Sequence, residues 1–289
     1  MSLHAALTPA REEVQAALDA ALAPLEGPVA DAMRYACDGG KRLRAVLALE
    51  SASLFDVPRA RAARVGAAIE AMHAYSLIHD DLPCMDDDDL RRGRPTVHRR
   101  WDEATAVLAG DALQTLAFEI VTDPETHPDP GVRAELALTL ARASGAAGMV
   151  RGQALDIAAE SAGAPLGLAE ITELQRLKTG CLLEWPCRAG AILGGADPAP
   201  LLAYAEKLGL AFQIADDLLD VEGDAATVGK AVGKDAAAGK ATFVSVLGVD
   251  GARAEAERLV TEAELSTLVY GDKAATLTLI ARYVVTRDR

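Results

Sequence analysis

Two groups of aspartates are the residues of this sequence best suited to carry chemistry. The first occupies the stretch from Asp80 to Asp89, where six of the ten residues are aspartates, and it interrupts an apolar helical pattern. Like charges this close repel one another unless cations neutralise them, and carboxylate oxygens are the ligands that Mg²⁺ prefers. A solvated acidic loop remains the alternative. A calcium-binding EF-hand loop is excluded, because the stretch lacks the alternating acids and central glycine of that motif.

The second group lies in the segment FQIADDLLD, which ends at Asp220. Asp216 and Asp220 are spaced i, i+4 and share one helix face, and Gln213 lies three residues before Asp216 on the same side. Two carboxylates one turn apart in an apolar helix are unfavourable without a cation. An exposed acidic helix edge is the alternative. Because two such groups can face each other across a helix bundle, their pairing favours a metal site between them.

Basic residues accompany the acidic ones. The first acidic group runs directly into Leu90-Arg91-Arg92-Gly93-Arg94, and carboxylates beside guanidinium groups predict a site for a metal-bound phosphate. A second basic run, Gly39-Gly40-Lys41-Arg42-Leu43-Arg44, opens a predicted helix and has Lys41 and Arg44 on one face. A bound anion would relieve the conflict between these cations and the helix dipole. An exposed basic turn is the alternative here.

Three further polar residues fit a phosphate site. His73 precedes Asp80 by seven residues and so lies on the same helix face, where it can donate to a phosphate. Lys178 and Thr179 belong to a helical segment whose apolar pattern the lysine interrupts. A packed or surface histidine and a solvated lysine are the ordinary alternatives.

A glycine-rich segment, 222–240, contains Lys230, Lys234 and Lys240 and has weak apolar patterning. We interpret it as a flexible surface segment or lid whose lysines can close over an anion. No GxxxxGK[ST] motif occurs there, which excludes a P-loop ATPase. Solvation is the better explanation of Lys234.

Helical periodicity dominates the elements that must position these residues. We find no convincing alternating strand and no fixed-length repeat. Glycine and proline mark the joints, and Trp185-Pro186 predicts a kink or an end within a helix. No break is long and polar enough to separate two cores, so the sequence predicts one all-α domain over residues 1–289. The predicted helices cover residues 8–23, 28–37, 41–54, 59–80, 103–121, 132–161, 168–195, 199–221, 250–263 and 273–285.

The composition excludes several classes of protein. Of the 289 residues 51% are hydrophobic, and 29 basic against 43 acidic residues give a net charge of −14. The hydrophobic content excludes intrinsic disorder, and the acidity argues against nucleic-acid binding. Four cysteines without CxxC spacing fit a reducing cytosol. Because we find neither a signal peptide nor a long uninterrupted apolar run, we expect a cytoplasmic protein without an integral membrane segment.

Taken together, the motifs resemble those of the trans-isoprenyl diphosphate synthases, or polyprenyl synthetases. The resemblance rests on GGKRLR, HAYSLIHDDLPCMDDDDLRRGRPTVH, LAGDALQTLAFE, KTG, FQIADDLLD and the series GK…GKD…GKAT. They occur in the family's order from about residue 25 to the end of the chain. The first aspartate motif has the bacterial form, with four residues between its second and third key aspartates.

The resemblance implies an isoprenoid synthase fold, in which about ten or more antiparallel helices surround a deep central cavity, and a homodimer. It implies a prenyltransferase that condenses isopentenyl diphosphate head-to-tail with dimethylallyl and then geranyl diphosphate. About three Mg²⁺ ions would accompany the bound diphosphate. A terpene cyclase of the same fold is a weaker alternative, because a single substrate needs no second diphosphate site.

Roles for individual residues also follow from the resemblance. The residues expected to contact Mg²⁺ are Asp80, Asp86 and Asp216, supported from behind by Asp81, Asp217 and Asp220. Those expected to bind isopentenyl diphosphate are Lys41, Arg44, His73 and Arg92. Those expected to hold the allylic diphosphate and act in its ionisation are Arg91, Lys178, Thr179, Gln213, Lys230 and Lys240.

Product length is expected to follow from pocket depth. Tyr75 and Ser76 lie five and four residues before Asp80, where the family has the floor of the pocket. The bulk of Tyr75 predicts a short product, C15 farnesyl diphosphate. Geranylgeranyl diphosphate, with C20, is the alternative, because a small residue at this position would open a longer tunnel.

Overall fold

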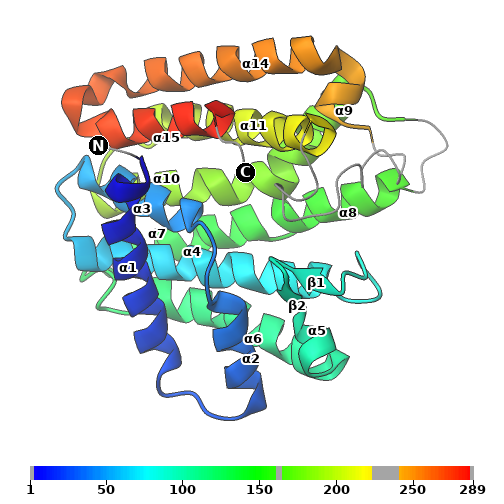
Figure 1. Ribbon diagram of the computed structural model, residues 1–289. Coiled ribbons are helices and arrows are strands. Elements are labelled where there is room, and N and C mark those ends of the chain that lie inside the picture. Colours follow the sequence, from blue (N-terminus) through cyan, green and yellow to red (C-terminus); the bar gives the residue numbers. More distant parts are fainter. Residues whose placement is uncertain (1–2, 161–164, 223–240, 287–289) are drawn as a thin grey trace. The chain divides into compact units, whose positions relative to one another are not determined.

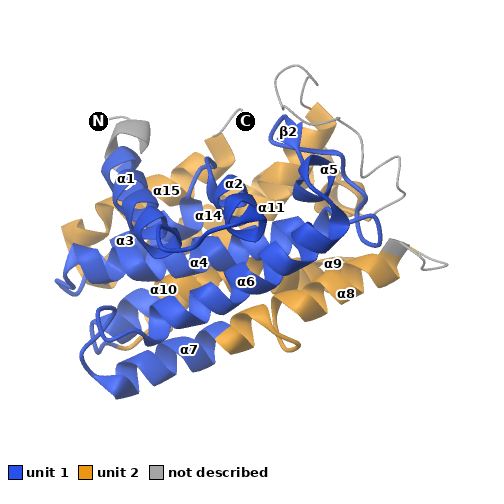
Figure 2. Ribbon diagram, turned by 90° about the horizontal axis from the view of Figure 1, so that it is seen from below, with its two compact units in different colours: residues 1–140, 189–196 blue, residues 141–188, 197–289 orange. Residues whose placement is uncertain are grey.

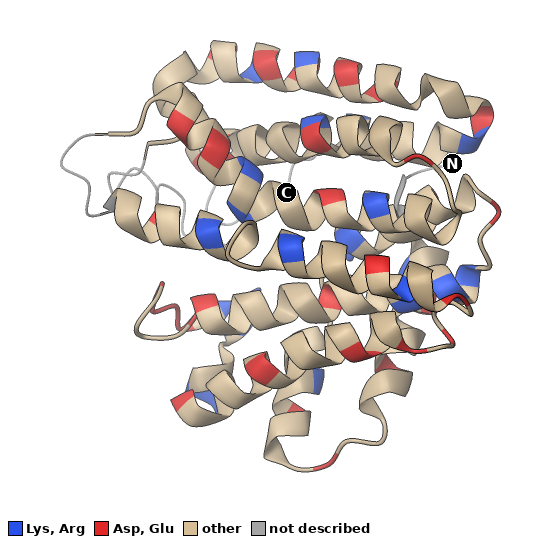
Figure 3. Cartoon of the chain, turned by 180° about the vertical axis from the view of Figure 1, so that it is seen from behind, with Lys and Arg blue, Asp and Glu red and all other residues tan. Residues whose placement is uncertain are grey.

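The computed structural model describes residues 3–160, 165–222 and 241–286. The chain divides into two compact units, one formed by Met1–Leu140 with Ala189–Ala196 and the other by Ala141–Arg188 with Asp197–Arg289 (Figure 2). Charged residues are spread over the helices of the chain (Figure 3). The single domain expected over 1–289 stays a prediction.

Unit 1 is built around helix α4, which packs against α1, α2, α3 and α6. Most α4 residues are buried, and many of them are alanines, so the helix lacks a polar stripe and forms the core of the unit. A Cβ at Gly66 would lie 2.8 Å from Cγ2 of Val14, which shows how closely α1 approaches. Its elements are α1 (Leu3–Leu22), α2 (Pro28–Cys37), α3 (Leu43–Ser53), α4 (Arg59–Asp80), β1 (Leu90–Arg91), β2 (Arg94–Pro95), α5 (Val97–Arg100), α6 (Glu103–Thr122) and most of α7 (Pro130–Ser144) (Figure 1).

Unit 2 has α11 at its centre, packed against α14, α15 and the π-helical turn η1. Tyr204 on α11 is fully buried, and its hydroxyl donates to the carbonyl of Leu277 on α15 at 2.7 Å. Its elements are α8 (Met149–Glu160), α9 (Leu168–Gln175), η1 (Arg176–Gly180), most of α10 (Cys181–Leu193), α11 (Ala199–Glu222), α14 (Phe243–Thr267), a 3-10 helix η2 (Leu268–Ala274) and α15 (Ala275–Thr286).

The all-α prediction is confirmed, and the bounds of α2 and α4 agree with the sequence pattern. The predicted helix 250–263 is too short, because α14 begins at Phe243 and includes Gly248, whose φ of 71° breaks helical geometry locally. Residues 268–274 form a 3-10 helix before α15.

Three local predictions are wrong. The expected helix 132–161 is two helices, α7 and α8, because the chain turns at Gly145–Gly148, where glycine weakens helix formation. Strands were not expected, yet β1 and β2 form a small hairpin. The expected helix 168–195 is interrupted, but it does not end at Trp185-Pro186: α10 runs through Pro186 to Leu193, and the kink expected there stays a prediction. The irregularity lies earlier, at η1, inside the expected helix 168–195.

One described helix, α6, is long and apolar enough to cross a membrane by length and composition alone. It packs against α4 and α2 within unit 1, and nearly half of its most apolar stretch is buried. A core helix passes the same test, so α6 is weak evidence for a membrane span.

Candidate active site

The basic loop before α3 turns its cations in different directions. Gly39 and Gly40 have positive φ angles of 77° and 88°, and Arg42 is also left-handed, with φ of 53°. The Arg42 side chain is buried, whereas Lys41 is exposed and Arg44 is half-buried. The loop therefore separates one cation that faces the protein from two that solvent can reach.

Arg92 lies directly against this loop. A Cβ atom at Gly40 would be 2.5 Å from Nη1 of Arg92, closer than a side chain allows. The missing side chain of Gly40 is what lets the guanidinium rest on the backbone next to Lys41. The structure therefore places Arg92 beside the loop that carries Lys41.

His73 on α4 contacts Arg44 on α3. Nη1 of Arg44 is 3.3 Å from Nε2 of His73, and because a guanidinium only donates, Nε2 must be the acceptor. Burial, together with the positive charges of Arg44 and Arg92, lowers the pKa of His73 well below its usual value. His73 is therefore neutral at pH 7, and its other ring nitrogen carries a proton that it can donate.

Helix α4 ends inside the first acidic group, at Asp80. The backbone N–H of Asp86 donates to the carbonyl of Asp80 at 2.9 Å, so the loop returns to the helix end. Asp81 is only 3% exposed, and Arg91 donates to both of its carboxylate oxygens over 2.5–2.9 Å. Burial raises the pKa of Asp81, and the hydrogen bonds from Arg91 oppose that rise. Asp81 thus faces Arg91.

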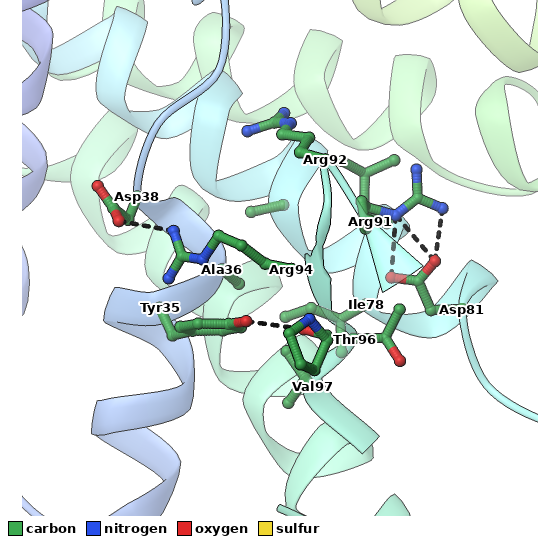
Figure 4. A pocket seen from close by; sticks show the side chains of 13 residues that line it. Tyr35, Ala36, Asp38, Ile78, Asp81, Arg91, Arg92, Arg94, Thr96 and Val97 are labelled. Carbon is green, nitrogen blue, oxygen red and sulfur yellow. Dashed lines mark hydrogen bonds and ion pairs between the residues drawn. The ribbon is translucent and has the colours of Figure 1, made fainter. Parts of the chain in front are cut away.

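The hairpin β1–β2 explains how two adjacent arginines separate. Its turn residues, Arg92 and Gly93, have φ angles of 54° and 73°, as in the type I′ turns that favour tight hairpins. Arg91 turns toward Asp81, whereas Arg92 extends away from that carboxylate (Figure 4). The two-residue turn therefore places the guanidinium groups of Arg91 and Arg92 on different sides of the hairpin.

A pocket lies between this hairpin, α2 and α4, and Figure 4 shows its lining. Nη1 of Arg94 donates to Oδ2 of Asp38 at 2.7 Å, and the Arg94 guanidinium lies 4.0 Å from the centre of the Tyr35 ring. The Tyr35 hydroxyl donates to the carbonyl of Pro95 at 2.8 Å. These contacts fasten the hairpin to the end of α2, immediately before the glycine loop.

In unit 2, Lys178 and Thr179 lie in the π-helical turn η1. Such single turns are frequent at functional sites. Nζ of Lys178 donates to Oδ2 of Asp156 on α8 at 2.6 Å. The two segments approach closely because residue 152 is glycine: a Cβ on Gly152 would lie 2.1 Å from the backbone nitrogen of Lys178. Helix α8 therefore both positions Lys178 and supplies its counter-charge.

Thr179, Gln213 and Asp217 form a chain of hydrogen bonds. The Thr179 hydroxyl donates to Oε1 of Gln213 at 3.4 Å, and Nε2 of Gln213 donates to Oδ1 of Asp217 at 3.2 Å. The backbone N–H of Phe243 donates to Oδ2 of Asp217 at 2.9 Å, which ties the start of α14 to α11. Asp217 is 5% exposed, so its carboxylate faces the protein.

Asp216 and Asp220 are half-buried and one turn apart on α11, as the sequence predicts. Asp80 and Asp86 belong to unit 1 and Asp216 to unit 2, so the expectation that they share one metal-bound diphosphate stays a prediction. Lys230 and Lys240 lie outside the described residues.

Tyr75 and Ser76 are buried in α4, with 5% and 7% exposure. The Tyr75 ring packs edge-on against the His79 ring, with centroids 5.6 Å apart, and the Ser76 hydroxyl donates to the carbonyl of His73 at 2.9 Å. Both residues therefore belong to the interior of unit 1, shortly before Asp80.

The donor set fits Mg²⁺ bound together with a substrate. Within the described ranges no group of three or more His, Cys, Asp or Glu side chains forms a complete metal site. Mg²⁺ commonly takes one or two carboxylates and completes its shell with water and substrate phosphates, so Asp80 and Asp86 suit it without a closed cage.

In unit 2, the buried Gln153 amide has no hydrogen-bond partner among the described residues, although buried amides normally have one.

The sequence motifs assign no role to four polar residues of these sites: Arg42, Glu70, Gln153 and Asp156. Glu70 is a charged residue inside an apolar helix, and Gln153 and Asp156 are spaced i, i+3 in an otherwise apolar segment. A polar residue that interrupts an apolar helical pattern is the signal by which Glu70, Gln153 and Asp156 can be recognised in the sequence. Arg42 offered none, because a sequence does not tell which cation of a basic run points inward.

The chain is all-α and carries two aspartate motifs accompanied by lysine, arginine and histidine side chains. These features define a class of proteins that bind metal-bound diphosphates. A model of the polyprenyl synthetase family matches residues 27–268, and the chain belongs to that family. It is 44% identical to the farnesyl diphosphate synthase of Escherichia coli (strain K12) over 96% of both proteins. It is 42% identical to a chloroplastic geranylgeranyl pyrophosphate synthase of Arabidopsis thaliana over 96% of this chain and 79% of that protein.

Among solved structures, the apo crystal structure of an FPP/GFPP synthase from Zymomonas mobilis is similar, with a TM-score of 0.89 and 48% sequence identity over 98% of both chains. The family resemblance predicted from the motifs is confirmed. The relatives give no support to the terpene cyclase alternative. Members of this family are in general Mg²⁺-dependent.

Proposed function

We propose that the protein is a farnesyl diphosphate synthase, which condenses isopentenyl diphosphate head-to-tail with dimethylallyl and then geranyl diphosphate. The observation that carries the proposal is its 44% identity to such a synthase over nearly the whole chain. Both aspartate motifs and the basic residues beside them are present in the sequence, which supports a complete catalytic apparatus.

The isopentenyl diphosphate is held by Lys41, Arg44, His73 and Arg92. Support comes from the contact of Arg44 with His73 and from the close approach of Arg92 to Gly40. A neutral His73 adds a hydrogen bond rather than a charge. Three cations and one neutral donor suit a diphosphate that must stay bound, because it belongs to the nucleophilic substrate and does not leave.

The allylic diphosphate is held by Arg91, Lys178, Thr179, Gln213, Lys230 and Lys240, with Asp80, Asp86 and Asp216 as ligands of about three Mg²⁺ ions. Arg91 and Lys178 are each paired with a carboxylate, Asp81 and Asp156, which fixes where their charges lie. Cations in fixed positions stabilise a departing diphosphate without having to reorganise during the reaction.

The reaction begins when the C–O bond to the allylic diphosphate breaks and its electron pair leaves with the diphosphate. Asp80, Asp86 and Asp216 would hold Mg²⁺, which would supply Lewis-acid stabilisation of that leaving group. The Thr179 hydroxyl, the Gln213 side-chain oxygen and the Lys178 carbonyl direct dipoles at the allylic cation. The double bond of isopentenyl diphosphate then attacks the cation, and anchoring both substrates is worth about 7–11 kcal/mol. The diphosphate released from the allylic substrate accepts the proton that the condensed cation loses.

The product is C15 farnesyl diphosphate. The buried ring of Tyr75, on the helix that leads to Asp80, supports a shallow pocket. Geranylgeranyl diphosphate is the competing product, and a synthase of that type is also a relative of this chain at 42% identity.

The protein acts as a cytoplasmic homodimer. Support for a dimer comes from α6, where Val107 and Leu108 are exposed by 41% and 54%. Contiguous exposed apolar surface marks interaction sites, and the partner proposed here is a second copy of the chain. Sedimentation analysis of the intact chain tests this part of the proposal.

Incubation with Mg²⁺, isopentenyl diphosphate and either dimethylallyl or geranyl diphosphate tests the function. Chromatography of the products should show linear C15 diphosphate, and EDTA should abolish its formation. A C20 product would mean that the protein is a geranylgeranyl diphosphate synthase and not a farnesyl diphosphate synthase. Cyclic hydrocarbons, or no condensation in the presence of Mg²⁺, would contradict the proposal.

A further inference from the structure

Arg42 stands in the middle of the basic loop but faces the protein. It is 7% exposed, and Nη1 donates to Oε2 of Glu70 at 3.2 Å. Nη2 donates to Oε1 of Gln15 at 2.5 Å and also to the carbonyl of Cys37. One guanidinium thus ties together α1, the end of α2, and α4, directly beneath the loop that carries Lys41.

Glu70 completes the start of α3. Helix α3 has no side-chain cap of its own, because its N-cap residue is Arg42. Oε1 of Glu70 accepts a hydrogen bond from the backbone N–H of Ala45, the third residue of α3, at 3.1 Å. This is the bond that an N-cap side chain would ordinarily accept. A carboxylate at a helix N-terminus also meets the positive end of the helix dipole.

Both ends of this ion pair adjoin predicted substrate ligands. Arg42 lies between Lys41 and Arg44 in the sequence, and its backbone is in the left-handed conformation. Glu70 lies one turn before His73 on α4. The side chains of the pair are each 6% exposed, so neither is available to a substrate.

We propose that Arg42 and Glu70 are a positioning pair that holds Lys41, Arg44 and His73 in register for the diphosphate of isopentenyl diphosphate. The inference rests on the proposed function. The pair keeps a non-glycine residue in the left-handed region, which side chains disfavour. Without this ion pair, the loop and the first turn of α3 would change conformation. Lys41 and Arg44 would then no longer be placed to bind the same diphosphate.

The test is the double variant Arg42→Met/Glu70→Leu, in which apolar side chains of similar length leave no orphaned buried charge. The KM for isopentenyl diphosphate should rise about tenfold or more, as for the loss of other supporting residues. The KM for geranyl diphosphate should change less than about twofold. An unchanged KM for isopentenyl diphosphate in a folded double variant would overturn the proposal.

Glu70→Gln serves if the double variant does not fold, because glutamine keeps an acceptor for the Ala45 N–H. Its KM for isopentenyl diphosphate should rise about threefold, in line with a weakened hydrogen bond. An unchanged value in this folded variant would also overturn the proposal. Tyr204→Phe is the matched control. It removes a buried hydrogen bond in unit 2 and should lower the melting temperature without changing either KM.

A failure of the proposed function would be seen separately. Wild-type protein that does not condense the two substrates would refute the synthase assignment before any variant is made. Calorimetric titration with isopentenyl diphosphate would still test the pair in that case. Equal affinity of wild type and double variant would overturn the positioning role.

Discussion

The two aspartate motifs hold their second carboxylate in different ways. Asp81 and Asp217 are both nearly inaccessible, at 3% and 5% exposure. Asp81 is paired with a full positive charge on Arg91, whereas Asp217 accepts from the neutral amide of Gln213 and a backbone N–H. The first aspartate of each pair remains partly exposed. Two adjacent aspartates in a sequence are therefore not equivalent, and in both motifs the second one is built into the fold.

The largest expected effect is on turnover, and it separates the two aspartates within each motif. Asp80→Asn and Asp216→Asn should each reduce kcat by about 10³-fold, because a metal ligand stabilises the leaving group by several kcal/mol. Asp81→Asn and Asp217→Asn should cost about 10–100-fold, as for residues that only support ligands. Steady-state rates at saturating and limiting Mg²⁺ measure both. Equal losses for first and second aspartates would remove the distinction.

The helices that enter the two motifs differ in the residue five positions before the first aspartate, which is Tyr75 in α4 and Ala211 in α11. We therefore expect α4 to limit product length. Tyr75→Ala should shift the product from C15 to C20 or longer, since it deletes a buried ring. Tyr75→Phe keeps the ring and should leave C15 unchanged. Chromatography of the dephosphorylated products reads out both, and an unlengthened product from Tyr75→Ala would rule out this role.

Stability should also distinguish the second aspartates. Asp81→Asn gives up an ion pair with three hydrogen bonds, so the free energy of unfolding should fall by about 2 kcal/mol. Asp217→Asn replaces one of the two carboxylate oxygens that accept hydrogen bonds from Gln213 and Phe243. The free energy of unfolding should fall by about 1 kcal/mol. Urea denaturation at pH 7 measures the difference. A larger loss for Asp217 would mean that Asp217 contributes more to the stability of the fold than Asp81 does.

The smallest expected effect concerns pH. The five histidines lie at 4, 73, 79, 98 and 127, all within unit 1, and His73 is held neutral there. Its folded pKa lies below the usual 6.5, so only the unfolded chain takes up its proton just below that pH. Stability should therefore be complete above pH 6.5 and fall by about 1 kcal/mol per pH unit below it.

Urea denaturation at pH 7.5 and 5.5 checks this dependence, and His73→Gln should flatten it. His127→Gln, on a loop residue outside this contact, is the control and should keep the wild-type slope. A slope in His73→Gln equal to that of wild type would assign the effect to other groups.

Much of this arrangement was predictable from the sequence, for identifiable reasons. The bounds of α4 agree with the predicted helix 59–80, and in the sequence Pro58 precedes this helix and Asp81-Leu82-Pro83 follows it. The expected ligands Arg44 and His73 do lie together. The π-helical turn at Lys178 was not predictable, because an extra residue within a helical turn leaves no mark in the apolar period. The different burial of Asp81 and Asp80 depends on the hairpin turn at Arg92-Gly93, which directs Arg91 toward Asp81. The sequence does not reveal this backbone geometry.

The glycine at position 152 has a consequence for anyone who wishes to redesign this protein. With no space for even a methyl group above the Lys178 backbone, α8 and η1 cannot be varied one at a time. Any library that randomises Gly152 would mostly sample displaced Lys178 and Thr179 and would be poor in active clones. Engineers should hold this position constant and place diversity at exposed positions of α8, such as Leu155 and Ile157, which are exposed by 36% and 41%.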